Sequence, residues 1–215
     1  MTPGSRPFGP WMIALAWIPA VTVTAYWSAV VVKSIRMKKR RGKMPNVIPR
    51  ERTGRYVRLL WAPTVVAWIA QLYLYALRLA RTSPWLLTPL FIRGVVPAAI
   101  GALCCVIALG LTFVCWQQMG ASWRIGIDPS EKTRLVVRGA YRRVRHPIYA
   151  LSILLMLGCV LVVPTPLMLL TAGIHIGLLA WEACREEAYL LTAHGEAYLE
   201  YQRHTGRFLP RVRFL

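Results

Sequence analysis

The sequence predicts an all-α membrane protein with about five transmembrane helices, a helical hairpin among them, and a cytosolic helical cap at the C-terminus. Three observations support this fold class. More than half of the 215 residues, 56%, are hydrophobic, yet the formal net charge is +19. The charged residues are segregated from long apolar runs instead of being scattered along them. These runs match the roughly 20 residues that a helix needs to cross a hydrocarbon core of about 30 Å.

Three apolar runs in the first half of the chain predict one membrane helix each. The first, Trp11 to Val32, has no charge, and the basic block that follows it argues against a cleavable signal peptide. The second, Leu59 to Ala80, is interrupted mainly by Gln71 and Arg78. The third, Gly94 to Gln118, is uncharged throughout.

The last apolar stretch, Ile148 to Trp181, predicts a helical hairpin. It is too long for one span and carries Pro164-Thr165-Pro166 near its middle. Because proline lacks an amide proton and disfavours helix in the residue before it, we expect two arms of about 16 residues joined by a turn. Such arms are short for a full span. The following stretch, Glu182 to His204, is expected to be helical, with Gly195 as a break or cap between two halves.

The basic residues predict the orientation in the membrane. Of the 27 lysines and arginines, 23 fall in the segments 33–58, 124–145 and 185–213, which share one side if five helices alternate. The positive-inside rule places that side in the cytoplasm, with the N-terminus outside. Attraction to anionic lipid accounts for these cations, so we expect no nucleic-acid partner. The five cysteines show no disulfide framework and no zinc-ligand spacing, so we expect no metal.

Two clusters of polar residues stand apart from this pattern. Five of the eight acidic residues crowd into 182–200, which on its own is typical of a solvated interfacial helix paired with arginines. Arg145 and His146 directly precede Pro147, which suits the first turn of the hairpin's first helix. A helix start favours anions through its free amides and the positive end of its dipole.

Five short motifs follow one another between about Trp123 and Pro210. They are R-G-x-Y (Arg138–Tyr141), R-H-P-x-Y (Arg145–Tyr149), E-E-x-x-L (Glu186–Leu190), G-E-x-Y-x-x-Y (Gly195–Tyr201) and R-F-L-P (Arg207–Pro210). In this order and spacing they resemble the isoprenylcysteine carboxyl methyltransferase family, to which the membrane phospholipid N-methyltransferases are related. A glycine that often follows the second motif is replaced here by Ala150. The N-terminal half shows hydrophobicity alone and does not identify the substrate.

The resemblance implies an integral membrane methyltransferase that uses S-adenosylmethionine, with its active site facing the cytoplasm. Its acceptor would be lipophilic and membrane-borne, with the carboxylate of an isoprenylated cysteine or a similar lipid acid favoured. Arg145 and His146 suit the carboxylate of the cofactor by charge-assisted hydrogen bonding. Glu186 and Glu187 suit its ammonium group or ribose.

The remaining candidates are aromatic, apolar or cationic. Tyr149, Leu190 and Tyr201 suit the adenine or the sulfonium, which aromatic faces attract. Tyr141 belongs to the cofactor-binding set through its motif. A carboxylate acceptor is ionised at neutral pH and needs a cation to hold it, whereas an amine acceptor would need a base such as a glutamate. The catalytic candidates for that cation are Arg207 and Arg124.

Other interpretations stay open at this point. Membrane sterol or ene reductases that use NADPH have a similar tail, although they are usually longer and have more membrane helices. A phospholipid N-methyltransferase and a non-catalytic lipid-binding membrane protein are the further alternatives. His175, inside the last apolar stretch, is interpreted as a core histidine with satisfied hydrogen bonds. We expect residues 1–118 to form the N-terminal transmembrane part with a basic cytosolic loop, and residues 119–215 the cofactor-binding part.

Overall fold

The computed structural model of the protein describes residues 10–42, 52–77, 90, 94–123, 126 and 135–211. This part of the chain contains α-helices, short 3-10 turns and one isolated bridge, and it has no β-strand. The α-helices are α1 (Pro10–Arg41), α2 (Arg52–Ala76), α3 (Val95–Met119), α4 (Pro147–Val162), α5 (Pro166–His194) and α6 (Glu196–His204), and the 3-10 turns are η3 (Gly120–Ser122) and η4 (Gly139–Arg142).

The prediction of a polytopic all-α membrane protein is confirmed. Helices α1, α2, α3 and α5 are long and apolar enough to cross a membrane. Helix α4 is apolar but has only 16 residues, a rise of about 24 Å, so the expectation of a short first hairpin arm also holds. Large apolar side chains such as Val66, Val96 and Leu103 are exposed on the helix surfaces, as contact with lipid requires.

The second arm of the hairpin differs from the expectation of about 16 residues. Helix α5 runs for 29 residues, because nothing between Pro166 and Gly195 breaks it. It begins with an N-cap in which Thr165 Oγ1 accepts a hydrogen bond from the Met168 amide. The predicted break at Gly195 is confirmed: this residue has a φ of +55° and joins α5 to α6. Glu182, Glu186 and Glu187 of the acidic cluster therefore lie on the last turns of a membrane helix, whereas Glu196 and Glu200 lie on α6.

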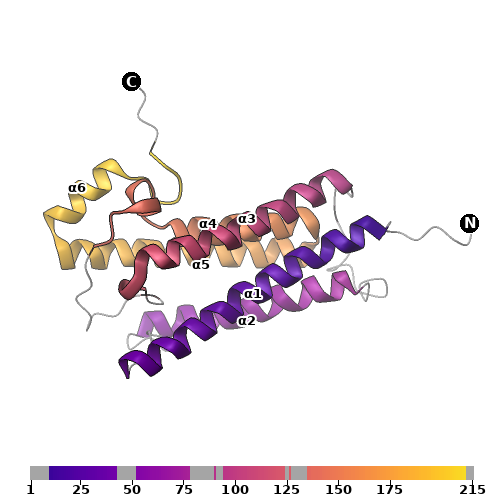
Figure 1. Cartoon of the computed structure of the whole chain (residues 1–215), viewed down its shortest axis with the longest axis horizontal. Coiled ribbons are helices and arrows are strands. Elements are labelled where there is room, and N and C mark those ends of the chain that lie inside the picture. The colour runs from indigo at the N-terminus through magenta and orange to yellow at the C-terminus, as the bar shows by residue number, and fades with distance from the viewer. Residues whose placement is uncertain are drawn as a thin grey trace, which may run out of the picture.

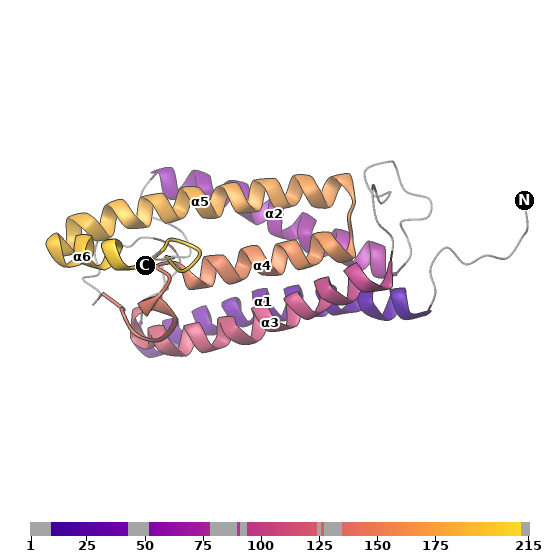
Figure 2. The same ribbon diagram turned by 90° about the horizontal axis from the view of Figure 1, so that it is seen from above.

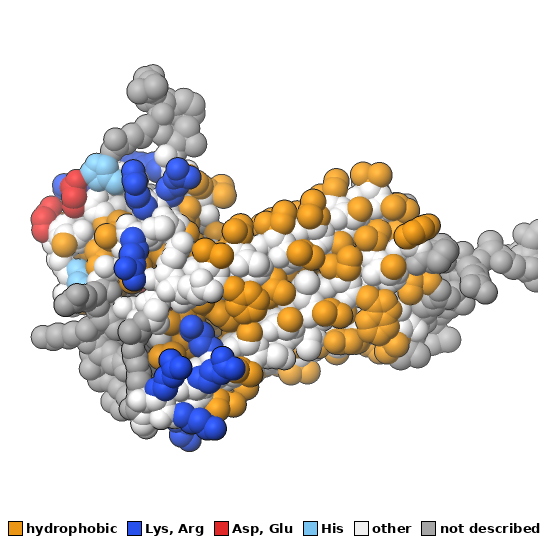
Figure 3. Space-filling view, viewed as in Figure 1, with side chains coloured by type: hydrophobic (Ala, Val, Ile, Leu, Met, Phe, Trp, Pro, Cys, Tyr) orange, Lys and Arg blue, Asp and Glu red, His pale blue; other side chains and the backbone are white. Residues whose placement is uncertain are grey.

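Helices α1 to α5 lie side by side and alternate in direction (Figures 1 and 2). Helices α1, α3 and α5 run toward the end of the molecule that carries α6, while α2 and α4 run away from it. On the face shown in Figure 3, the lysines and arginines gather at that end, and hydrophobic side chains cover the remaining length of the bundle. We call this the basic end; its cytoplasmic orientation stays a prediction.

Helices α3 and α4 approach each other through a pair of glycines. A Cβ on Gly101 would come within 2.5 Å of the Gly158 carbonyl oxygen, and one on Gly158 within 2.6 Å of the Gly101 carbonyl oxygen. Small residues of this kind allow close contact between membrane helices. The contact fixes α4, and with it the motif residues at the start of α4, against the N-terminal helices.

The C-terminal segment returns to the start of α4 and forms a cap at the basic end. Gly206 pairs with Val144 in a parallel bridge, in which the Arg145 amide donates to the Gly206 carbonyl at 2.8 Å. The His146 amide donates to the Arg207 carbonyl at 3.0 Å. A Cβ on Gly206 would meet the Leu209 carbonyl oxygen at 1.7 Å, so this turn requires glycine.

Candidate active site

A cavity of about 200 Å³ lies at the basic end, between the helices and the C-terminal cap. All six α-helices contribute to its wall. The aromatic side chains of its wall are Tyr26, Trp27, Trp61, Trp116, Trp123, Tyr141, Tyr149, Tyr198 and Tyr201. Its charged and titratable groups are Arg58, Arg145, His146, Glu182 and Glu186. An apolar, aromatic hollow with a few polar groups is typical of a small-molecule site.

The structure brings most of the sequence-predicted site residues to this cavity. Those that line it are Tyr141, Arg145, His146, Tyr149, Glu186, Leu190 and Tyr201. Glu187 and Arg207 lie beside the cavity, and neither side chain forms part of its wall. Arg124 falls outside the described residues, so its expected role as an acceptor-binding cation stays untested.

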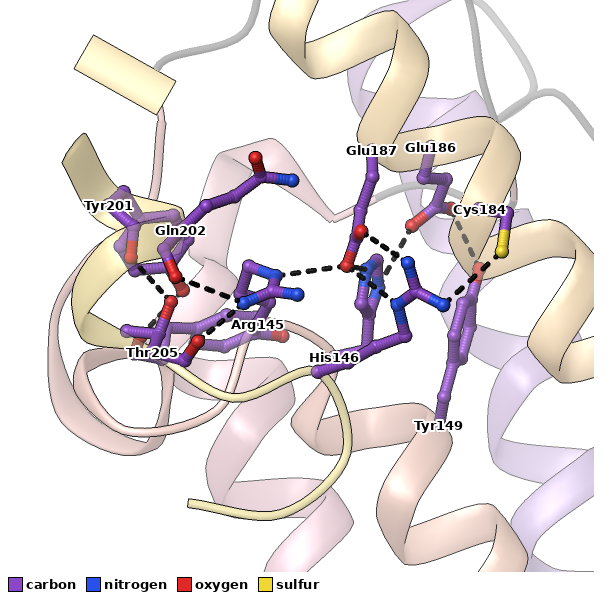
Figure 4. A network of polar contacts seen from close by, with 11 residues as sticks. Arg145, His146, Tyr149, Cys184, Glu186, Glu187, Tyr201, Gln202 and Thr205 are labelled. Atoms are coloured by element: carbon purple, nitrogen blue, oxygen red, sulfur yellow. Dashed lines mark hydrogen bonds and ion pairs between the residues drawn. The ribbon is translucent and has the colours of Figure 1, made fainter. Parts of the chain in front are cut away.

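Glu187 is the centre of a cluster of cations (Figure 4). Its Oε1 accepts hydrogen bonds from Arg145 Nε at 2.9 Å and from Arg207 Nε at 3.1 Å, and it lies 3.2 Å from His146 Nε2. Its Oε2 accepts a hydrogen bond from Arg207 Nη2 at 2.8 Å. We call these four residues the clamp, because they join α5, the start of α4 and the C-terminal segment.

The remaining donors of the two clamp arginines also serve the structure. Arg145 Nη1 donates to the carbonyl oxygens of Gln202 and Thr205, which close α6. Arg207 Nη1 donates to Cys184 Sγ at 3.3 Å. These contacts hold Arg207 against α5, beside the cavity in which we expected it to bind an acceptor. The donors of Arg145, which we expected to hold the cofactor carboxylate, are used by Glu187 and by the two carbonyl oxygens.

His146 and Tyr149 connect the clamp to the cavity wall. Their rings stack with centroids 5.3 Å apart, and Tyr149 Oη donates to Glu186 Oε1 at 2.7 Å. His146 Nδ1 lies 3.5 Å from Glu186 Oε2, so this imidazole stands between two carboxylates. Burial alone would lower the pKa of His146, but the hydrogen bonds to Glu186 and Glu187 outweigh it and raise the pKa above its ordinary value.

A set of tyrosines ties α6 to the turn before α4. Tyr201 Oη donates to the Tyr141 carbonyl oxygen at 2.6 Å, and the Tyr198 and Tyr201 rings lie 6.0 Å apart. Burial raises the pKa of Tyr201 to about 12 and moves the pKa values of Tyr141 and Tyr198 further upward. These phenols are therefore neutral parts of the wall and do not supply a base at neutral pH.

The opposite wall of the cavity was not found by the sequence analysis. Helices α1 and α2 contribute Tyr26, Trp27 and Trp61, together with Arg58, whose guanidinium lies 5.6 Å from the Trp61 ring centroid. Arg58 was counted only among the cations that set topology. The sequence does not set it apart from Arg52 and Arg55, because all three precede the apolar run that begins at Leu59.

A polar network supports this wall from behind. His175 is fully buried, and its Nδ1 lies 3.3 Å from Trp61 Nε1 while its Nε2 lies 2.9 Å from Ser152 Oγ. Because an indole nitrogen is only a donor, Nδ1 accepts and Nε2 carries the proton. The interpretation of His175 as a satisfied core histidine is thus confirmed.

The comparison with protein families gives one match. The model of a family described as phospholipid methyltransferase matches residues 96–197, from α3 to the start of α6. The chain is similar to phospholipid methyltransferases. This region includes Tyr141, the start of α4 and both glutamates of the E-E pair, and the similarity indicates a membrane methyltransferase acting on a lipid-related substrate. Neither the curated proteins nor the solved structures give a match.

Proposed function

We propose that the protein transfers the methyl group of S-adenosylmethionine to a lipophilic acceptor, within the cavity at the basic end. The observation that carries the proposal is the composition of that cavity. It places carboxylates (Glu182 and Glu186) and many aromatic faces together at the end of an apolar helix bundle. Carboxylates and aromatic rings both attract a sulfonium cation, and apolar walls exclude the water that would compete with them.

The residues present fit such a cofactor. Its ammonium and sulfonium suit Glu182 and Glu186, and its adenine suits the faces of Tyr149, Leu190 and Tyr201. Buried nitrogens of Trp27 and Arg58 in the same wall have no hydrogen-bond partner in the described part of the chain, which is expected of donors that await a ligand. When bound, the cofactor supplies an activated methyl group on a leaving thioether.

The protein's own contribution is positioning. The acceptor's lone pair must approach the methyl carbon in line with the breaking carbon–sulfur bond, at about 3 Å. A carboxylate acceptor releases no proton in this step, whereas a primary or secondary amine releases one. Glu186, hydrogen-bonded to Tyr149 and close to His146, is the carboxylate of the cavity that we assign to receive that proton.

Two acceptor classes fit the apolar cavity. The motif resemblance favours the carboxylate of an isoprenylated cysteine, and the family match favours the amine of a phospholipid. The two products differ chemically, since a methyl ester releases methanol in base and an N-methyl group does not. The same detergent-purified protein can therefore be tested with both.

The test supplies isotope-labelled S-adenosylmethionine and offers farnesylcysteine or phosphatidylethanolamine as acceptor. We expect label in lipid with one of them, and base lability of the label assigns its position. Binding of S-adenosylhomocysteine but not of NADPH is expected in calorimetry. Binding of NADPH alone would replace the proposal with a reductase, and binding of neither with a non-catalytic lipid protein.

A further inference from the structure

Arg58 is a half-buried cation whose hydrogen-bonding capacity is incompletely used among the described residues. Its Nε is inaccessible to solvent and has no hydrogen-bond partner among the described residues. Trp27 Nε1, on the neighbouring helix and in the same cavity wall, is in the same state. A buried donor without a partner costs free energy, more so on a charged group, so both nitrogens would gain from a hydrogen-bond acceptor in the cavity.

The nearby carboxylates do not satisfy Arg58 Nε. Glu182 attracts the guanidinium, but its Oε2 accepts a hydrogen bond from Arg185 Nη1 at 2.5 Å. Glu186 accepts from Tyr149. Arg145, the other arginine of the cavity wall, is occupied by Glu187 and by backbone carbonyls.

Arg58 and Glu182 both approach Gly126, and all three residues line the cavity. A Cβ on Gly126 would lie 3.6 Å from Arg58 Nη2 and only 2.7 Å from Glu182 Oε1. The guanidinium and this carboxylate therefore meet at the same part of the cavity wall. A ligand group placed there faces a cation on one side and an anion on the other.

The donors at this part of the wall determine the ligand's chemistry. A guanidinium and an indole N–H donate and do not accept, and a guanidinium fork matches a carboxylate or phosphate. A bare anion would be repelled by Glu182 and Glu186, whereas an anion with a cation beside it would not. We propose that Arg58 and the Trp27 indole form an oxyanion site for the carboxylate or phosphate of a zwitterionic group, whose cation faces the two glutamates.

Two ligands of the proposed function, on which this inference rests, carry such a group. One is the amino-acid end of the cofactor, and the other is an acceptor head in which an amine stands beside a phosphate or carboxylate. The variant Arg58→Met removes the charge and keeps an unbranched side chain. Arg55→Met is the matched control, because Arg55 is exposed one turn earlier on the same helix. Trp27→Phe removes the indole N–H and keeps an aromatic ring.

Binding measurements separate the two sources. If the site holds the cofactor's carboxylate, Arg58→Met should weaken S-adenosylhomocysteine binding by about 10- to 150-fold. Methylthioadenosine, which lacks the amino-acid end, should bind as before. If the site holds the acceptor, both affinities should be unchanged and the acceptor KM should rise by a similar factor. Trp27→Phe should follow the same pattern with a smaller change of about 2- to 12-fold.

The same variants test the site independently of methyl transfer. Glycerophosphoethanolamine, titrated in a thermal-shift assay, should stabilise the wild-type protein and Arg55→Met but not Arg58→Met if the head-group source is correct. This result would support the site even if no methyl transfer were found. Unchanged cofactor affinity, acceptor KM and thermal shift in Arg58→Met would overturn the proposal, as would an equal loss in Arg55→Met.

Discussion

On the C-terminal side of the cavity, Glu187 is surrounded by Arg145, His146 and Arg207, and each of these cations contacts it. On the α1–α2 side, Arg58 and Trp27 each hold a buried nitrogen that has no hydrogen-bond partner in the part of the chain that the structure describes. Both sides are charged or aromatic and both belong to the same site. They differ in how much of their hydrogen-bonding capacity the fold already uses.

This difference distinguishes residues that hold the fold together from residues that are free to bind a ligand, and the sequence motifs do not make that distinction. The clamp residues belong to the recognisable motifs, yet their contacts are directed at one another and at the backbone of the C-terminal segment. Among the described residues of the cavity wall, the two nitrogens without a partner, Trp27 Nε1 and Arg58 Nε, stand on helices that carry no motif, and on the motif side the buried Tyr198 hydroxyl is in the same state. We infer that the motif side holds the cavity closed, while the α1–α2 side has the freedom to distinguish ligands.

The comparison predicts its largest loss of stability for a substitution of Glu187. Glu187→Gln removes the only carboxylate that meets all three cations of the clamp in the described structure. Removing one partner of a buried ion pair leaves the others uncompensated and costs about 3–5 kcal/mol. We expect a loss of that order in the free energy of unfolding in detergent, with earlier proteolysis after α6.

The control for this variant is Glu200→Gln. Glu200 pairs with Arg203 and His204, but the side chains are 55%, 65% and 51% exposed. Exposed pairs contribute about 0–1 kcal/mol, so this variant should unfold almost as the wild type does. Equal losses in the two variants would show that the clamp has no special structural weight.

Much of the fold could be predicted because membrane spans depend on local composition. The apolar runs identified every long helix, and Pro164 and Pro166 located the hairpin turn. The length of α5 was missed because the change from apolar to acidic residues was interpreted as a helix boundary. No residue in that stretch breaks a helix, so α5 continues through it.

The site could be predicted only where the positions of residues along the chain already imply that they meet in space. The R-H-P-x-Y and E-E motifs flank one hairpin, so their meeting follows from the turn. The α1–α2 wall depends instead on how each membrane helix is rotated about its axis. Contacts such as Trp61 with His175, 114 residues apart, leave no periodic signal in uniformly apolar helices. For the same reason the sequence did not show that Arg207 turns toward Glu187 and Cys184.

A smaller change in stability is expected when a change of pH alters the protonation of His146. Burial lowers the pKa of His146 and the contacts with Glu186 and Glu187 raise it. The contacts outweigh burial, so the pKa is raised above its ordinary value by the difference between these two opposed effects. A raised pKa contributes stability below the unfolded-state value of about 6.5, and this stability is lost as the pH rises through the folded-state value. Thermal stability of the wild type should therefore fall over this window. His146→Gln should show a flatter profile, and an unchanged slope would contradict the assigned contacts.

The smallest change in stability is expected from Arg58→Met. The substitution removes a half-buried charge whose buried Nε has no partner among the described residues, so the lost attraction to Glu182 and the Trp61 ring is offset by the relief of a desolvated donor. Glu182 keeps its hydrogen bond to Arg185. We expect the free energy of unfolding to change by less than about 1 kcal/mol, with either sign, because apolar replacement of an incompletely paired buried ion is often neutral or stabilising.

The comparison variant is Arg145→Met, measured in the same detergent. Its free energy of unfolding should fall several times more, because it loses the hydrogen bonds to Glu187 and to two backbone carbonyls. If Arg58→Met proved as destabilising as Arg145→Met, Arg58 would be a structural residue like those of the clamp, and the two sides of the cavity would not differ in the way described.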